Sequence, residues 1–294
     1  MTTLDEIFNA NRRRLFGLAY RMLGSAADAE DIVQETWLRT RGADAGALEA
    51  PQAFLVTVAT RLCLDHLRSA RARRETYVGA WLPEPIPDTG AAPPDASVEL
   101  ADDLSFALLM ALEKLSPEER AAFLLHDVFD VPFGEVAATL GYTAANCRQL
   151  AARARRAVQR DAPRRKATRA EHEALLMKFA EAVSLGDPAR IAALFAPDAV
   201  AYSDGGGVKP AALNPIRGAD RIARLLVGLE TKSMPMRART RVSLAEINGA
   251  PGFLLFIDDA LDQTVTIETD GGKIRALYMV RNPAKLGALG AHKG

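Results

Sequence analysis

The chain has 294 residues, of which 49% are hydrophobic and 25% charged, and its 37 basic side chains balance its 37 acidic ones. This length suggests about two domains with hydrophobic cores, and the composition is that of a soluble globular protein. The two cysteines lack the spacing of a zinc site or a disulfide framework, the N-terminus has no apolar signal core, and no apolar run is long enough to span a bilayer, so we expect a cytoplasmic protein with no metal and no cofactor.

The first block, residues 1 to about 78, is predicted to be helical. Apolar residues recur at helical spacing in residues 4–23, and Ser25 or Asp28 can cap a second helix that begins with acids and ends with arginines. A third helix is expected over residues 51–74. Its apolar residues face inward, and another face carries Arg61, Asp65 and Arg68.

A proline-rich stretch follows, from Trp81 to Asp95, with five prolines in fifteen residues. Prolines at this density cannot continue a helix or sit in a central strand, so the stretch is predicted to be a linker. It nevertheless begins with a tryptophan, whereas linkers are normally small and polar. A large apolar ring in a proline frame indicates a segment that docks against another part of the protein.

The next helical block, from about Ser97 to Pro163, changes the sign of its charge along the chain. Acidic residues dominate between Asp95 and Glu135, and basic residues dominate from Arg148 to Arg169. A basic stripe on a helix is a typical footprint for a phosphate backbone, although such a run is also typical of a solvated helix face.

The same block contains a helix-turn-helix pattern. Ser116 begins a capped helix, a short helix over residues 132–140 meets Gly141, and a further helix begins at once with Thr143 as its expected N-cap. The alternative interpretation is an ordinary pair of helices in a small bundle.

In a helix-turn-helix, the N-terminal residues of the second helix reach base edges and its basic remainder holds phosphates. Arginine suits guanine, and asparagine or glutamine suits adenine, through bidentate contacts. The base-reading candidates are Asn146, Arg148 and Gln149, and Arg153 follows them in the basic stripe.

These motifs carry a family resemblance. "DAEDIVQETWLR", followed by "FLVTVATRLCLDHLRSARARR" and the helix-turn-helix, resembles the bacterial extracytoplasmic-function (ECF) RNA polymerase sigma factors. The first block is similar to sigma region two and the second to sigma region four. The resemblance implies a subunit that binds core RNA polymerase, recognises the minus-thirty-five element through region four, and reads and melts the minus-ten element through region two.

The resemblance also implies roles for particular residues. Those that fall where the family contacts the polymerase clamp helices are Asp31, Gln34 and Glu35. Those on the helix that faces the minus-ten element are Arg61, Asp65, Arg68 and Arg71. The arginines at the end of this helix suit the task, because melted DNA needs cations for its single-strand phosphates.

The last block, residues 168 to 294, has a different character. An amphipathic helix and a shorter helix precede a strand, a further helix and four β-like runs, the last two joined by Asp270-Gly271-Gly272 as a hairpin signal. Helices followed by an antiparallel meander predict an α+β fold. The block resembles the SnoaL-like cone, a curved sheet wrapped by helices around a cavity.

That resemblance raises a rival function, because SnoaL-like domains include polyketide cyclases and epoxide hydrolases. An enzyme needs a titratable pair held at the reacting atom. The block offers separated histidines, His172 and His292, and acids near a strand end, at Asp258, Asp259 and Asp262, where a turn is the simpler explanation. We expect no catalytic residues. An enzyme or small-ligand sensor tethered to a DNA-binding module is the alternative.

Sigma factors with a SnoaL-like extension form a subgroup, and this chain carries its three motifs. WLPEP is intact as Trp81, Leu82, Pro83, Glu84 and Pro85. DGGGK is interrupted by Val208 and comprises Asp204, Gly205, Gly206, Gly207 and Lys209. NPDKL has Ala284 in place of its acid and comprises Asn282, Pro283, Lys285 and Leu286. The resemblance implies an interdomain regulatory contact, in which the extension packs on the linker and on region two and buries Trp81.

The predicted organisation is multidomain. All-α region two covers residues 1–78, a linker 79–99, all-α region four 100–165, and the α+β SnoaL-like domain 168–294. A fused domain acts at high effective concentration, so it can replace a separate anti-sigma protein. The expected partners are core RNA polymerase and promoter DNA, with no membrane partner, and the sequence identifies no ligand for the cone.

Overall fold

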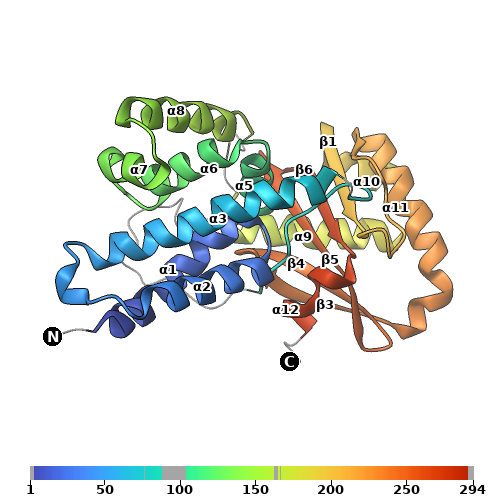
Figure 1. Cartoon of the computed structure of the whole chain (residues 1–294). Helices are drawn as coiled ribbons and strands as arrows, with labels where there is room; N and C mark the ends of the chain where they lie inside the picture. Colours follow the sequence, from blue (N-terminus) through green and yellow to red (C-terminus); the bar gives the residue numbers. More distant parts are fainter. Residues whose placement is uncertain (1–2, 76, 88–103, 162–164, 166, 291–294) are drawn as a thin grey trace. The chain divides into compact units, whose positions relative to one another are not determined.

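The structure, a computed structural model, describes residues 3–75, 77–87, 104–161, 165 and 167–290, which form two compact units (Figure 1). The first unit comprises residues 1–76, 92–104 and 108–161, and the second comprises residues 77–91, 105–107 and 162–294. The described part of the proline-rich stretch, residues 81–87, therefore belongs with the C-terminal domain and not with the helices that precede it.

The first part of the first unit is helical, as predicted. Its elements are α1 (Leu4–Leu23), α2 (Ala26–Thr40), a 3-10 turn (Ala45–Ala47) and α3 (Pro51–Glu75). Thr3 and Glu6 form a capping box at the start of α1, and Gly24 ends it in the left-handed conformation. The Ser25 hydroxyl accepts from the backbone N–H of Asp28, so Ser25 is the cap of α2.

The second part of this unit holds the remaining helices. They are α5 (Phe106–Glu113), whose first two residues belong to the second unit, α6 (Pro117–Phe123), a π-helical turn (Leu124–Val128), α7 (Phe133–Leu140) and α8 (Ala144–Asp161). Arg120 of α6 is 3% exposed. Its guanidinium bonds the Glu113 carboxylate at 2.8 Å and also the carbonyl oxygen of Met22 at the end of α1. A buried cation requires such partners, so Arg120 fastens the two helical parts together.

The second unit is an α+β domain, which confirms the predicted fold class. Its helices are α9 (Arg169–Ser184), α10 (Pro188–Leu194), α11 (Ala219–Ser233) and α12 (Gly287–Gly290), with 3-10 turns at Met234–Arg239 and Pro283–Lys285. Its strands are β1 (Phe195–Asp204), β2 (Ile216–Arg217), β3 (Thr240–Ile247), β4 (Ala250–Ile257), β5 (Ala260–Asp270) and β6 (Lys273–Val280).

These strands form one sheet in the order β2-β1-β6-β5-β4-β3. Strands β3 to β6 make the predicted antiparallel meander, and β1 pairs in parallel with β6. Gly271 and Gly272, in the turn between β5 and β6, both have positive φ, which explains the glycine pair.

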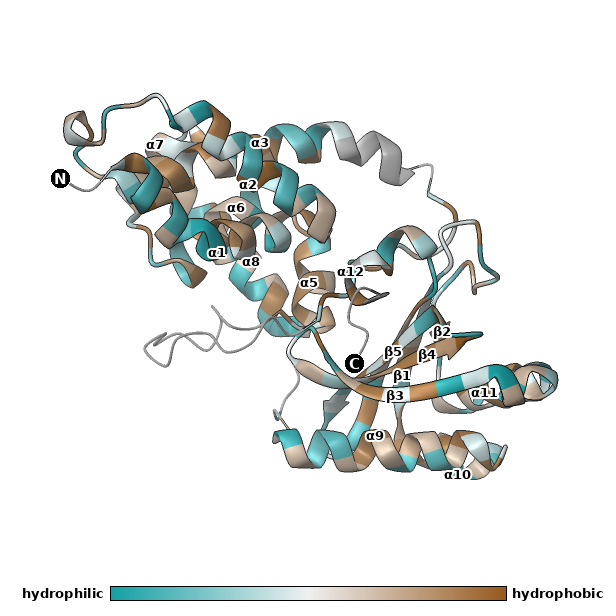
Figure 2. Ribbon diagram, turned by 90° about the horizontal axis from the view of Figure 1, so that it is seen from below, coloured by the Kyte–Doolittle hydropathy of each residue, from teal (hydrophilic) through white to brown (hydrophobic). Residues whose placement is uncertain are grey.

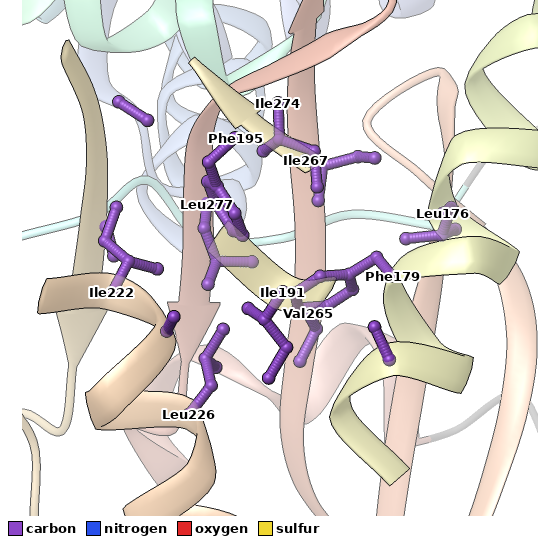
Figure 3. Packing of buried hydrophobic residues seen from close by; sticks show 14 of the residues in the cluster. Leu176, Phe179, Ile191, Phe195, Ile222, Leu226, Val265, Ile267, Ile274 and Leu277 are labelled. Carbon is purple, nitrogen blue, oxygen red and sulfur yellow. The ribbon is translucent and has the colours of Figure 1, made fainter. Parts of the chain in front are cut away.

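Helices α9, α10 and α11 cover one face of the sheet (Figure 2). Their buried side chains meet those of the strands, as shown for Leu176, Phe179, Ile191, Ile222, Leu226, Val265, Ile267 and Leu277 (Figure 3). Burial of apolar surface is the main favourable contribution to folding. This cluster therefore holds β1 and β6 in place, and the ends of these two strands carry two of the three motifs.

Ile191, which is fully buried, tests this core. Ile191→Ala should lower the free energy of unfolding by roughly 2–5 kcal/mol, because it removes buried methyl groups and leaves a cavity. Trp37 and Trp81 are the two tryptophans, one in each unit, so urea unfolding in a Trp37→Phe background reports the second unit through Trp81. Leu185→Ala, at a position 58% exposed, is the control. If Ile191→Ala and Leu185→Ala lowered the free energy of unfolding equally, the assignment of Ile191 to the core of the second unit would be wrong.

Candidate nucleic-acid interface and linker cluster

Helices α7 and α8 form the predicted helix-turn-helix. Gly141 ends α7 in the left-handed conformation. The Thr143 hydroxyl accepts from the backbone N–H of Asn146 at 3.2 Å, so Thr143 caps α8 as predicted. The first turns of α8 expose the three base-reading candidates, Asn146, Arg148 and Gln149.

One of these candidates, Arg148, lies against an aromatic ring. The guanidinium carbon of Arg148 lies 5.4 Å from the centroid of the Phe133 ring, and the His126 ring lies 3.7 Å from the same ring. A cation over an aromatic face is attracted by the ring electrons. The sequence analysis missed Phe133, and its position at the start of α7 gives no signal of this contact.

The basic stripe on α8 divides into two kinds of arginine. Arg155 bonds the Asp127 carboxylate through two of its nitrogens, one of them at 2.7 Å, so it anchors α8 to the π-helical turn. Arg153 is exposed and lies 3.2 Å from the Glu119 carboxylate. Part of the charge that suggested a DNA-binding surface therefore serves the packing of the helices.

Arg61, Asp65 and Arg68 lie on one exposed face of α3, as predicted. The Arg61 guanidinium donates to the carbonyl oxygens of Thr139 at 3.1 Å and Ala138 at 3.0 Å, at the end of α7. The hydroxyls of Thr57 and Thr139 are 3.0 Å apart beside this contact.

Arg68 makes weaker contacts on the same face of α3. Its guanidinium lies 3.2 Å from Asp65 and 3.7 Å from Glu118. The side chain of Arg71 lies outside the described residues.

The predicted polymerase-binding residues lie on one side of α2. Asp31 and Gln34 are exposed, and Glu35 pairs with Arg39 at 2.7 Å. Leu38 follows at helical spacing on the same side and is 44% exposed. The sequence analysis did not select Leu38, although an apolar residue four positions after Gln34 continues that helical face.

The three subgroup motifs converge in the second unit around the carboxylate of Asp204. This residue, at the end of β1, is 1% exposed. One oxygen accepts from the Tyr77 hydroxyl at 2.5 Å and the Gly206 N–H at 3.0 Å. The other accepts from the Leu82 N–H at 3.0 Å and the Lys285 ammonium at 2.7 Å. We call Tyr77, Leu82, Asp204, Gly206 and Lys285 the linker cluster.

Burial and these contacts also act on the Tyr77 hydroxyl. Burial, followed by the hydrogen bond to Asp204 and its negative charge, raises the pKa of Tyr77 well above its ordinary range. The Asn282 side-chain amide donates to the same hydroxyl at 2.8 Å and opposes that shift. Tyr77 therefore stays protonated and acts as a hydrogen-bond donor.

The expectation that Trp81 is buried is wrong. Trp81 is half-buried, and its neighbour Leu82 is fully buried. The Lys285 ammonium lies 4.2 Å from the centroid of the Trp81 ring and 5.0 Å from that of Tyr77. The ring covers a cation instead of filling a core, which explains both the aromatic residue and its exposure.

The remaining WLPEP residues, Pro83, Glu84 and Pro85, are buried. Beyond them, the backbone of Ile86 exchanges hydrogen bonds with Asn248, whose side-chain oxygen accepts at 3.1 Å and whose N–H donates at 3.0 Å. The sequence analysis missed Asn248, although Asn-Gly between two strands is a turn signal.

The glycines of the second motif allow a close approach. Gly206 has a φ of 62°, and a Cβ at this position would overlap the side chain of Asn282. Gly205 faces the Lys209 carbonyl so closely that a Cβ would overlap it, and Gly207 lies against Val78. In the third motif, Pro283 begins a 3-10 turn capped by Asn282, and Leu286 is buried.

Lys209 forms a second ionic group with residues that the sequence analysis did not link to it. Asp262 bonds Lys209 at 2.8 Å and Arg281 at 3.0 Å. Burial acts to raise the pKa of Asp262, but the two cations outweigh it and hold that pKa below its ordinary value. This carboxylate therefore stabilises the fold above the pKa of the unfolded chain, and the stabilisation is lost as the pH falls through the folded value. Val208, inserted before Lys209, is exposed.

The groups considered for catalysis have structural partners. Burial lowers the pKa of His172, and its ring nitrogen lies 3.1 Å from the Pro251 carbonyl oxygen. Asp258 and Asp259 have positive φ in the turn after β4, and Asp258 pairs with Arg239. Across the described residues, no group of three or more histidines, cysteines and acids is placed to hold a metal ion. His292 lies outside them.

The chain matches known proteins along its length. Residues 7–73 match the family model of Sigma-70 region 2, and residues 105–158 match that of Sigma-70, region 4. The chain is 42% identical to the ECF RNA polymerase sigma factor SigJ of Mycobacterium tuberculosis, over 95% of this chain and 91% of SigJ. It is 34% identical to the probable ECF RNA polymerase sigma factor SigI of the same species, over 99% of this chain and 97% of SigI.

The crystal structure of M. tuberculosis SigJ has the same fold, with a TM-score of 0.76 at 37% identity, and covers 96% of this chain and 98% of that one. Of the helices that the structure describes, none has the length and hydrophobicity needed to cross a membrane. Because the similarity to SigJ extends over nearly the whole of both chains, the protein belongs to the ECF RNA polymerase sigma factors and initiates transcription at promoters.

Proposed function

We propose that the C-terminal domain modulates this sigma factor through the linker cluster, without a separate anti-sigma protein. The observation that carries the proposal is the burial of Asp204 against donors from the linker and from the C-terminal segment. The proposed organisation is region two at residues 1–78, the linker at 79–99, region four at 100–165 and the regulatory domain at 168–294. The proposed partners are core polymerase and promoter DNA, in the cytoplasm.

The proposal assigns DNA contacts to both sigma regions. Asn146, Arg148 and Gln149 read bases in the minus-thirty-five element, and Arg153 holds phosphate. Exposure of the base-reading side chains at the start of a capped helix supports this assignment. Arg61, Asp65, Arg68 and Arg71 face the minus-ten element, and Asp31, Gln34 and Glu35 face the polymerase.

One consequence concerns the order of events at a promoter. Arg61 is bound to the carbonyl end of α7, in the helix-turn-helix. The same guanidinium cannot at once hold these carbonyls and single-stranded DNA. Region two and region four must therefore separate at this contact before Arg61 binds the minus-ten element, and core polymerase is the partner that we expect to hold them apart.

Polymerase binding is tested on α2. Leu38→Asp and Asp31→Arg should each weaken the affinity for core RNA polymerase about tenfold or more, because each places a mismatched charge at a desolvated contact. Fluorescence anisotropy of the labelled full-length protein measures this affinity. Glu30→Gln changes an adjacent acid that pairs with Arg12, and it is the control. Unchanged affinity in both test variants would argue against this surface.

Promoter reading is tested on α8. With core polymerase and a promoter library randomised in the minus-thirty-five element, Arg148→Ala should relax the preference at one base pair by roughly 1–3 kcal/mol. Arg153→Ala should lower run-off transcription about evenly across sequences, because phosphate contacts carry no sequence information. If Arg153→Ala relaxed the preference at one base pair and Arg148→Ala lowered transcription evenly, the base-reading and phosphate-binding roles would be assigned to the wrong residues.

The linker cluster is tested through its ion pair. Lys285→Met leaves the Asp204 charge buried with its neutral donors, so it should destabilise the second unit by roughly 3 kcal/mol, at the low end for a broken buried pair. Asp204→Asn in the Lys285→Met background should recover part of this loss. Unfolding followed by Trp81 fluorescence in the Trp37→Phe background measures both effects.

Lys285→Met also tests the regulatory role. With purified core polymerase as the only added protein, the full-length variant should give a different run-off yield from the parent chain at a temperature where both are folded. Equal yields would exclude control through this cluster. Absence of initiation by the parent chain until another protein is supplied would contradict regulation by the fused domain alone.

A further inference from the structure

A groove of about 720 Å³ lies on the C-terminal domain, away from the linker cluster. It is bounded by α10, the start of β1 and the start of α11, and the two helices pack beside each other (Figure 1). Its α10 side is lined by small apolar residues, among them Ala189, Ala192 and Ala193. The volume lies within the range of sites for small molecules.

The opposite side of the groove is basic. Arg217 at the end of β2 and Arg221 and Arg224 on α11 line it, and Asp220 is the acid among them. The two α11 arginines lie three residues apart, so they project from one side of the helix. The local charge therefore favours an anion.

These arginines differ from most of the other described arginines of the domain. Seven of those others have an acidic partner: Arg165, Arg169, Arg190, Arg237, Arg239, Arg241 and Arg281. Arg217, Arg221 and Arg224 have neither an ion pair nor a side-chain hydrogen bond within the described part of the chain, and all three line the same groove. Unpaired guanidinium groups gathered at one concave surface present a set of donors that matches phosphoryl oxygens.

The start of α11 adds to this field. The helix has fifteen residues and begins after Gly218, with no side-chain cap. Its first backbone N–H groups have no acceptor within the helix, and its dipole is positive at this end. Gly218 and Ala219 line the groove, so these donors lie on its margin.

From these observations we propose that the groove binds a phosphorylated small molecule of nucleotide size. Arg221, Arg224 and Arg217 hold its phosphoryl groups, and its organic part lies against Ala189, Ala192 and Ala193. The proposal goes beyond the regulatory role proposed for the linker cluster and does not depend on it. It gives the C-terminal domain a ligand class.

Isothermal titration calorimetry of the full-length protein at roughly 0.15 M ionic strength tests the proposal with pyrophosphate, ADP and adenosine. Pyrophosphate and ADP should bind with one-to-one stoichiometry and a dissociation constant below about 1 mM, and adenosine should bind far more weakly. The double variant Arg221→Ala/Arg224→Ala should weaken both phosphorylated probes about tenfold or more. Arg237→Ala, which removes an exposed arginine outside the groove, is the matched control and should leave binding unchanged.

A second variant separates the two parts of the site. Ala193→Phe, at an exposed position on the apolar wall, should weaken ADP and leave pyrophosphate unchanged. Unfolding followed by Trp81 fluorescence checks that each variant is folded.

The proposal is overturned if pyrophosphate does not bind the parent chain, or if Arg237→Ala weakens binding as much as the double variant does. It is also overturned if the double variant lowers affinity for duplex DNA while neither small probe binds, because the arginines would then form a DNA surface. Calorimetry measures ligand binding and not transcription, so a negative result would overturn only the proposed ligand site. The regulatory role proposed for the linker cluster would be unaffected.

Discussion

The buried carboxylate of Asp204 is the constraint on which the arrangement of the linker depends. A charge almost fully removed from water needs donors on both oxygens. Here the donors come from three segments: Tyr77 and Leu82 in residues 77–87, Gly206 after β1, and Lys285 near the C-terminus. None of these segments satisfies the carboxylate alone, so each depends on the other two for its position. The three motifs act as one structural unit and not as separate turns.

The sigma regions present a different kind of contact. Arg120 is buried between α5, α6 and the end of α1, and its departure would remove a cation from the Glu113 carboxylate and a donor from the Met22 carbonyl oxygen. Arg61 is exposed and bonds neutral carbonyls at the end of α7, so water or phosphate can replace these partners at little cost. The first unit thus contains a buried contact, made by Arg120, and an exposed contact, made by Arg61, whose partners can be replaced. Arg61 is also one of the residues predicted to contact DNA.

Local signals made much of this fold predictable. The caps at Ser25, Ser116 and Thr143, the glycine at 141 and the Gly271-Gly272 hairpin are each decided by neighbouring residues, and the structure has them as predicted. Contacts between distant residues were accessible only through motif resemblance, which assigned the motifs of Asp204 and Lys285 to one interdomain contact but gave no pairing between them and did not include Tyr77, Asn248 or Asp262. Trp81 was misjudged because an aromatic ring serves equally to fill a core or to cover a cation, and the sequence does not say which.

The linker is also held at its far end. Phe106, at the start of α5, stacks on Tyr278 of β6 with ring centroids 5.2 Å apart, and both rings belong to the second unit. A free segment from Glu75 to Phe106 could extend roughly 105 Å, whereas the part between the anchor at Pro87 and Phe106 extends at most roughly 65 Å. While both anchors hold, the separation of Pro87 and Phe106 is set by the distance between Ile247 and Tyr278 on the sheet and not by the length of the chain that joins them.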